Sequence, residues 1–380
     1  MCFVRRAAAC VLLCAALIPA FSVCAVSVSA EAAVLLCAET GEVLYEKQAH
    51  KRLPMASTTK IMTALLTLEE AAPQRKVQVT REMTAVEGTS MGLLPGDTVT
   101  LYALACGMLL ASGNDAANTA AIAIDGSTQA FAARMNARAA AIGMTDKHFV
   151  TPSGLDDEDH YSTAYDMALL ACEALRNAQF VRICGSESLR TSYGNPPYAR
   201  TLTNHNRLLQ LYADCIGVKT GFTKKSGRCL VSAARRGGVT LVAVTLRDPD
   251  DWNDHIALLE SGFSQVRAAA LDGDLSALRI PVTGGNYADV AVTCAEAPQG
   301  VLAAGGGDVR RAVFIRPFLY APVRQGELVG RVVYTQGTRT VCVCDLLAGR
   351  SVSARPAPKT VPQPRGGRLH SWLEWIKGVF

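Results

Sequence analysis

The spacing of hydrophobic residues in the first half of the chain changes from strand-like to helical. Two apolar runs within residues 33–45 flank Glu39-Thr40-Gly41, a pattern typical of a β-hairpin. From Ser57 onwards, apolar residues recur at i, i+3, i+4 and i+7, which predicts an amphipathic helix. Further alanine-rich helical stretches follow at 101–110, 115–124, 129–142 and 162–175. The sequence therefore predicts a strand pair followed by a helical middle.

Near Ile216 the hydrophobic period becomes two, which indicates β-strands. The predicted strands are 216–222, 229–234 and 240–246, followed by a closing helix at 257–263. Strand pairs on both sides of a helical middle favour an α+β fold with an antiparallel sheet over alternating β-α-β units.

Short alternating runs between glycine-rich turns continue from Leu278 to about Val352 and predict a separate small all-β domain. Four prolines between Ser353 and Gly367 indicate a semi-extended linker. The predicted organisation is a signal peptide at 1–30, the larger α+β domain at 31–272, the all-β domain at 273–352, the linker at 353–367 and a terminal helix at 368–380.

The two ends of the chain predict export. Arg5 and Arg6 precede an apolar run, and Val28-Ser29-Ala30 offers a cleavage site, the pattern of a signal peptide. An uncleaved membrane anchor is the alternative. In the last 13 residues the apolar side chains gather on one side of a helix beside basic ones, which suits the outer surface of the cytoplasmic membrane better than spanning it.

Charge and cysteine content narrow the function classes. The net charge is +5, but without the signal arginines and the basic tail the remaining body carries about −1, which argues against nucleic acid as a partner. Nine of the 13 cysteines follow the signal, and none has the spacing of a metal site. The acidic run 156–160 is expected to be a solvated loop, although a cation site is the alternative. No pattern predicts a metal ion or another cofactor.

The first candidate motif is Ser57-Thr58-Thr59-Lys60. At a helix start, side chains three residues apart share a face. A serine hydroxyl needs a neighbouring base to act as a nucleophile, and a lysine with a lowered pKa can serve as that base. The alternative is an N-cap serine followed by an ordinary surface lysine.

The second motif, Ser112-Gly113-Asn114, lies between two predicted helices. Ser112 is a candidate proton shuttle to the leaving amine, and Asn114 a candidate holder of the substrate amide or of Lys60. A plain helix-to-helix turn is the alternative.

The third motif, Lys219-Thr220-Gly221, lies on a predicted strand. A cation and a hydroxyl suit a terminal carboxylate, and glycine lets the substrate backbone approach closely. The backbone N–H groups of Ser57 and Phe222 are candidates for stabilising the oxyanion. The alternative is a strand end with a solvated lysine.

In this order and behind an export signal, the three motifs form a serine/lysine acyl-transfer signature. The chain resembles the low-molecular-weight penicillin-binding proteins, specifically the serine-type D-alanyl-D-alanine carboxypeptidases. The segments that carry the likeness are 54–64, 148–155, 161–167 and 217–223.

The resemblance implies a DD-peptidase/β-lactamase-like domain, an antiparallel sheet with a helical subdomain, followed by a small all-β domain and a membrane tail. It implies that Ser57 is the acyl-ester nucleophile, Lys60 the proton acceptor, Ser112 a further catalytic residue and Lys219 a substrate binder. Peptidoglycan stem peptides are the implied substrates, and β-lactams the implied covalent inhibitors.

Two other interpretations stay open at this point. A secreted β-lactamase would need a glutamate placed for deacylation, which sequence cannot locate. A non-catalytic β-lactam sensor would also retain an intact serine and lysine. Turnover of penicillin against stable trapping distinguishes the three.

Overall fold

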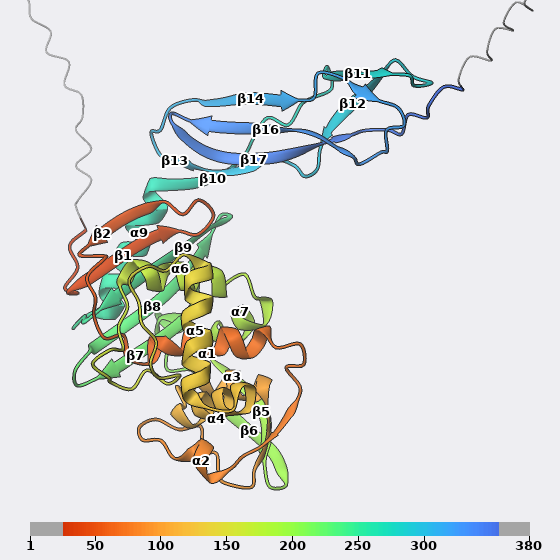
Figure 1. Cartoon of the computed structure of the whole chain (residues 1–380). Coiled ribbons are helices and arrows are strands. Elements are labelled where there is room, and N and C mark those ends of the chain that lie inside the picture. Colours follow the sequence, from red (N-terminus) through yellow and green to blue (C-terminus); the bar gives the residue numbers. More distant parts are fainter. Residues whose placement is uncertain (1–25, 357–380) are drawn as a thin grey trace, which may run out of the picture.

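The computed structural model describes residues 26–356 (Figure 1). Most of the predicted signal peptide and linker, and the whole predicted terminal helix, lie outside the described residues. Within the described part of the chain, no helix is long and apolar enough to cross a membrane.

The central sheet has five antiparallel strands in the order β2-β1-β9-β8-β7. These strands are β1 (Ala32–Cys37), β2 (Val43–Lys47), β7 (Cys215–Thr223), β8 (Gly227–Arg236) and β9 (Val239–Leu246). Strand β1 pairs with β9 from Ala32 opposite Leu246 to Cys37 opposite Leu241, so the start of the chain is joined to its middle. Strand β7 forms one edge of the sheet.

Helices cover both faces of this sheet. Val34 of β1 and Val244 of β9 face a core shared with α1 and α6, whereas their neighbours Leu35 and Ala243 face a core shared with α9. Because both faces are covered, β9 is buried along its whole length, and its sequence is apolar except for Thr240 and Thr245.

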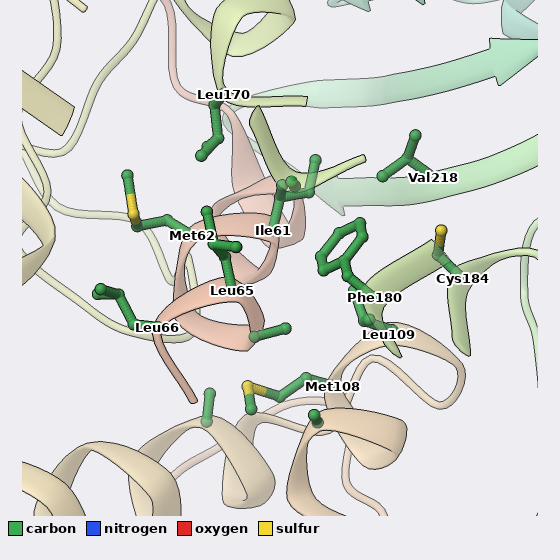
Figure 2. Close-up of a cluster of buried hydrophobic side chains, with 14 of the residues drawn as sticks. Ile61, Met62, Leu65, Leu66, Met108, Leu109, Leu170, Phe180, Cys184 and Val218 are labelled. Carbon is green, nitrogen blue, oxygen red and sulfur yellow. The ribbon is translucent and has the colours of Figure 1, made fainter. Parts of the chain in front are cut away.

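The helical part packs around α1, which is buried on nearly all sides. Figure 2 shows Ile61 and Leu65 of α1 among apolar side chains from α3, α6 and α7. Thr100, Ser127, Thr163 and Asn177 cap α3, α5, α6 and α7. The helical elements are a 3₁₀ turn at Ala56–Thr59, α1 (Lys60–Glu69), α2 (Arg81–Thr84), α3 (Leu101–Leu109), α4 (Asn114–Asp125), α5 (Thr128–Ile142), α6 (Ala164–Ala174), α7 (Ala178–Cys184), α8 (Leu208–Leu211) and α9 (Asp251–Gln265).

A second, four-stranded antiparallel sheet that sequence analysis did not predict borders the helical part. Its order is β3-β4-β5-β6. The strands are β3 (Lys76–Gln78), β4 (Thr98–Thr100), β5 (Ser188–Gly194) and β6 (Pro197–Thr203). Two of them have three residues each, and β6 is largely exposed, so they lack a strong apolar alternation.

The C-terminal part is all-β. A six-stranded sheet has the order β14-β16-β17-β12-β11-β15, and a two-stranded sheet joins β10 to β13. Its core contains Ile280, Val290, Val332 and Leu346. The strands are β10 (Val266–Ala270), β11 (Arg279–Thr283), β12 (Asp289–Cys294), β13 (Gln299–Ala303), β14 (Val309–Ile315), β15 (Leu319–Tyr320), β16 (Leu328–Gln336) and β17 (Arg339–Ala348). The expected fold class, an α+β domain followed by an all-β domain, is confirmed.

The predicted domain boundary at residue 272 stays a prediction. Strand β10 precedes that position but pairs with β13, which follows it.

Candidate active site

The Ser57 side chain lies at the mouth of a pocket because the chain turns sharply before α1. Ala56 has a φ of 48°, and Ser57 lies in the 3₁₀ turn that leads into the helix. The N-cap residues of this turn and of α1 are Met55 and Thr59, so the N-cap interpretation of Ser57 does not hold. Lys60, the first residue of α1, places its Nζ 2.8 Å from Ser57 Oγ.

Lys60 is fully buried and has two further oxygen partners. Its Nζ donates to Asn114 Oδ1 at 2.7 Å and to the Ser153 carbonyl at 2.6 Å. Burial lowers the Lys60 pKa well below its ordinary value, Lys219 lowers it further, and Asp115 opposes the shift. A neutral amine has two N–H donors and one lone pair. Since both other partners only accept, the lone pair is left for the Ser57 hydroxyl.

The loop between α3 and α4 brings the second motif into the same pocket. Ser112 has a φ of 57° and is nearly buried, and its carbonyl accepts a hydrogen bond from Thr89 Oγ1 at 2.7 Å. Its hydroxyl makes no hydrogen bond to the described residues, so it is available to a ligand. Asn114 donates from Nδ2 to the Glu87 carbonyl while Oδ1 receives Lys60. The amide thus holds Lys60, one of the two roles considered from sequence.

Asp115 was not a sequence candidate, yet it shapes the wall of the pocket. Its carboxylate accepts the backbone N–H groups of Met91, Gly92 and Leu93, and the hydroxyl of Ser90. These hydrogen bonds give partners to backbone N–H groups that would otherwise be unpaired, and they fix the loop that carries Thr89. The signal in the sequence was only its position after Asn114.

The third motif lies on β7, the edge strand. Lys219 is 1% exposed, and its Nζ donates to the Thr220 carbonyl at 2.8 Å. Burial lowers the Lys219 pKa to about 7. A Cβ at Gly221 would lie 3.1 Å from Ser57 N, a tight contact, so the glycine favours the close approach of β7 to the nucleophile.

The structure brings the predicted residues together in one pocket of about 300 Å³. Ser57, Ser112, Thr220, Gly221 and Phe222 line it. Lys60, Asn114 and Lys219 lie beneath its wall, buried and hydrogen-bonded. The same pocket is also lined by His205, Arg228, Asp251 and Trp252, which sequence analysis did not single out.

Known proteins include a family whose sequence pattern matches this chain. The family model of D-alanyl-D-alanine carboxypeptidases matches residues 20–250. The chain belongs to the D-alanyl-D-alanine carboxypeptidase family. Membership confirms the expected serine-type carboxypeptidase function with β-lactam binding.

Relatives of this family match most of the chain. D-alanyl-D-alanine carboxypeptidase DacF of Bacillus subtilis is 33% identical over 318 residues, 80% of this chain and 81% of the relative. DacC of Escherichia coli is 31% identical over 352 residues, 87% of this chain and 83% of the relative. Penicillin binding protein 5 of Haemophilus influenzae superposes with a TM-score of 0.68 at 24% identity, covering 86% of this chain and 98% of that structure, which supports the fold.

The acidic run 156–160, which the sequence predicts to be a solvated loop, is exposed at its four acidic positions. Its last residue, His160, is buried instead. Its Nδ1 accepts the backbone N–H of Val150, and Nε2 lies 2.8 Å from Thr59 Oγ1. Burial lowers the His160 pKa to about 4, so the ring is neutral and helps to fix the turn before Lys60. Among residues 26–356, no group of His, Cys, Asp and Glu is arranged to hold a metal ion.

The nine cysteines that follow residue 25 are all free thiols in the described structure. Cys37, Cys106, Cys184 and Cys229 are buried, as expected of small hydrophobic side chains, and the other five are half-buried. None of them lines the pocket.

Proposed function

We propose that the protein removes the terminal D-alanine from peptidoglycan stem pentapeptides through an ester on Ser57. The observation that carries this proposal is the 2.8 Å approach of Lys60 Nζ to Ser57 Oγ, with both N–H groups of the neutral amine committed elsewhere. Ser57 Oγ attacks the carbonyl between the two D-alanines while its proton passes to Lys60. Collapse of the tetrahedral intermediate breaks the C–N bond, and the leaving amine takes up the proton that Lys60 accepted. Water then hydrolyses the ester, which returns Ser57 to its hydroxyl form and releases the shortened peptide.

The remaining roles follow from position. We assign the oxyanion to the backbone N–H groups of Ser57 and Phe222, which the close approach of Gly221 supports. Ser112, with its hydroxyl free in the pocket, is the proposed proton shuttle to the leaving D-alanine. Lys219 and Thr220 are the proposed clamp for the terminal carboxylate.

Strand β7 also explains how a peptide lies in the site. Because β7 is an edge strand, its outer side is available to an extended peptide, which aligns along the strand as an added one. A substrate aligned in this way presents its terminal carboxylate to the third motif and its scissile carbonyl to Ser57.

The test is mass spectrometry of a muramyl pentapeptide after incubation with the enzyme. We expect the loss of one terminal alanine and no further shortening. A pentapeptide that remains intact, with an enzyme that still binds penicillin covalently, would contradict the proposal.

Export to the outer face of the cytoplasmic membrane, with residues 368–380 as a peripheral anchor, is a further proposal from sequence. The arrangement of tryptophans and basic residues in that segment supports it.

A further inference from the structure

The pocket extends beyond the residues that the proposed reaction uses. Its lining also includes Phe222 on β7, Arg228 on β8, and Asp251 and Trp252 at the start of α9. None of these side chains has a role in the steps described above. The proposed reaction therefore does not explain why these four side chains line the pocket.

The direction of the substrate places its preceding residues at this end of the pocket. A peptide whose carboxylate binds Lys219 and Thr220 runs along β7 past Gly221 towards Phe222. Strands and extended peptides advance about 3.3 Å per residue, so the residue before the two alanines lies about two residues further on. Phe222 and Arg228 are directly opposite each other across the two strands, so their side chains share one face at that level.

The side chains at this level combine apolar walls with one cation. Phe222 lines the pocket and is 66% exposed, so its ring is available to a ligand. Trp252 is half-buried and packs against the core of α9. The Arg228 guanidinium lies 5.4 Å from the centre of the Trp252 ring. Both rings line the pocket, so they offer apolar surface to an aliphatic stem.

Arg228 is held in place but is not saturated. Its Nη2 donates to the Asp251 carboxylate, which is only 4% exposed and fixes the guanidinium, whereas the Arg228 side chain is 43% exposed. Within residues 26–356 it makes no other side-chain hydrogen bond, so donors remain for a ligand. The exposed Lys224 and Lys225 of the adjacent turn add positive charge. A carboxylate is the group that a fixed guanidinium recognises best.

We propose that Phe222, Arg228 and Trp252 form a subsite for the side chain of the residue before the two alanines, and that this subsite takes an aliphatic side chain ending in a carboxylate. The proposal rests on the proposed function, since that function sets the direction of the peptide. It names the substrate class as stem peptides whose third residue is a diamino acid with a side-chain carboxylate, rather than lysine.

The test compares two peptides, Nα-acetyl-X-D-Ala-D-Ala, with X either meso-diaminopimelate or L-lysine. The two side chains have similar aliphatic stems and an amino group, and only the first carries a carboxylate. We expect kcat/KM of the wild type to be about tenfold higher for the diaminopimelate peptide, as one charge-assisted hydrogen bond provides. Arg228→Gln should bring the ratio close to one, and Arg228→Lys should leave part of it.

Arg176→Gln is the matched control, because Arg176 is also paired with a carboxylate, that of Glu173, but lies outside the pocket and is 81% exposed. It should keep the wild-type ratio. A wild-type ratio near one, or equal losses for both peptides in Arg228→Gln, would overturn the subsite. If the wild type cleaves neither peptide while fluorescent penicillin still labels it, the proposed function itself fails. Labelling of Arg228→Gln by the same probe shows that the variant is folded.

Discussion

Lys60 and Lys219 are both buried in one small region, and their different surroundings give them different states. Burial lowers the Lys60 pKa well below its ordinary value, and the positive charge of Lys219 lowers it further. The Lys219 pKa falls to about 7 through burial alone. The neutral form suits a base, and the charged form suits a carboxylate clamp, so the two roles are separated by environment rather than by residue type.

This separation predicts a pH dependence. Lys219 is protonated in the free enzyme only below about pH 7, so kcat/KM for a substrate with a free terminal carboxylate should fall as the pH rises through about 7. A bound carboxylate raises the Lys219 pKa, so kcat should fall at a higher pH than kcat/KM. A rise in pH also favours the neutral form of Lys60, which is the form that acts as a base, so Lys60 does not cause the fall in kcat/KM. Steady-state rates measured with an amidated analogue should lack this alkaline limb, and an identical limb for both substrates would refute the clamp.

At this scale, the sequence predicts the side chains proposed for the chemistry and Asn114, which holds Lys60, but not the other groups that hold them. Ser57 and Lys60 were found because a reactive pair needs fixed residue types at a fixed spacing. The Ser153 carbonyl that holds Lys60 could not be found, since any residue supplies a backbone carbonyl. Arg228 and Trp252 meet only because β8 and α9 pack together, which no local pattern encodes.

Among the elements, the segment after Pro152 shows how tightly the turn before α1 is enclosed. Gly154 has a φ of 81°, and a Cβ there would lie 2.0 Å from the Ala56 carbonyl oxygen. The carbonyl of its neighbour Ser153 binds Lys60. Space at this glycine is therefore needed both by the turn that carries Ser57 and by the base.

Gly154→Ala should destabilise the protein by more than about 3 kcal/mol and slow acylation by penicillin about 100-fold. Gly126→Ala is the matched control, because Gly126 has a φ of 80° with nothing within 4 Å of an added Cβ. It should cost about 1 kcal/mol, the penalty of a left-handed conformation alone, and leave acylation unchanged. Urea unfolding and stopped-flow labelling measure both quantities. Equal effects of the two substitutions would show that the close contact at Gly154 is unimportant.

The elements that the sequence predicts correctly are those with a strong hydrophobic period. The hairpin at the start, α1, and the three strands from β7 to β9 each bury one face or both, which forces the pattern. The four-stranded sheet was missed because its strands are short and polar, and β3 depends on pairing with the distant β4. The ends of α3, α4, α5 and α6 were predicted within two residues, whereas α9 begins six residues before its predicted start and α2, α7 and α8 were missed.

At the scale of the whole molecule, the structure bears on where the mature chain begins. Residues before the predicted cleavage site at Ala30 are part of the fold. The Ser29 backbone N–H donates to Asp254 at 2.6 Å, its hydroxyl donates to Asp248 at 2.9 Å, and Val28 is buried. Cleavage after Ala30 would remove these contacts.

We therefore expect signal cleavage at Val23-Cys24-Ala25, which also ends in a small residue, so that the mature chain starts at Val26. The intact mass of the processed protein, purified from a secreting host, measures this directly. A mass that corresponds to a chain starting at Glu31 would contradict the expectation.

The proposed terminal anchor is tested by deletion. Removal of residues 365–380 should release the processed enzyme from membranes, because the apolar face and the basic residues that bind the surface are lost. Cleavage of a soluble pentapeptide should stay within about twofold, since the deleted residues supply none of the described pocket. Fractionation by sedimentation measures the first effect. Continued sedimentation of the truncated, signal-cleaved protein with membranes would rule out the anchor.

The central claim is that Ser57, with Lys60 as its base, forms the acyl-enzyme. The most direct measurement is labelling with fluorescent penicillin followed by peptide mapping of the wild type and of Ser57→Ala. Equal melting temperatures of the two proteins show that the variant is folded. The account predicts one label on the wild-type peptide that contains Ser57, and none on Ser57→Ala. A label on another residue, or persistent labelling of the folded Ser57→Ala protein, would contradict it.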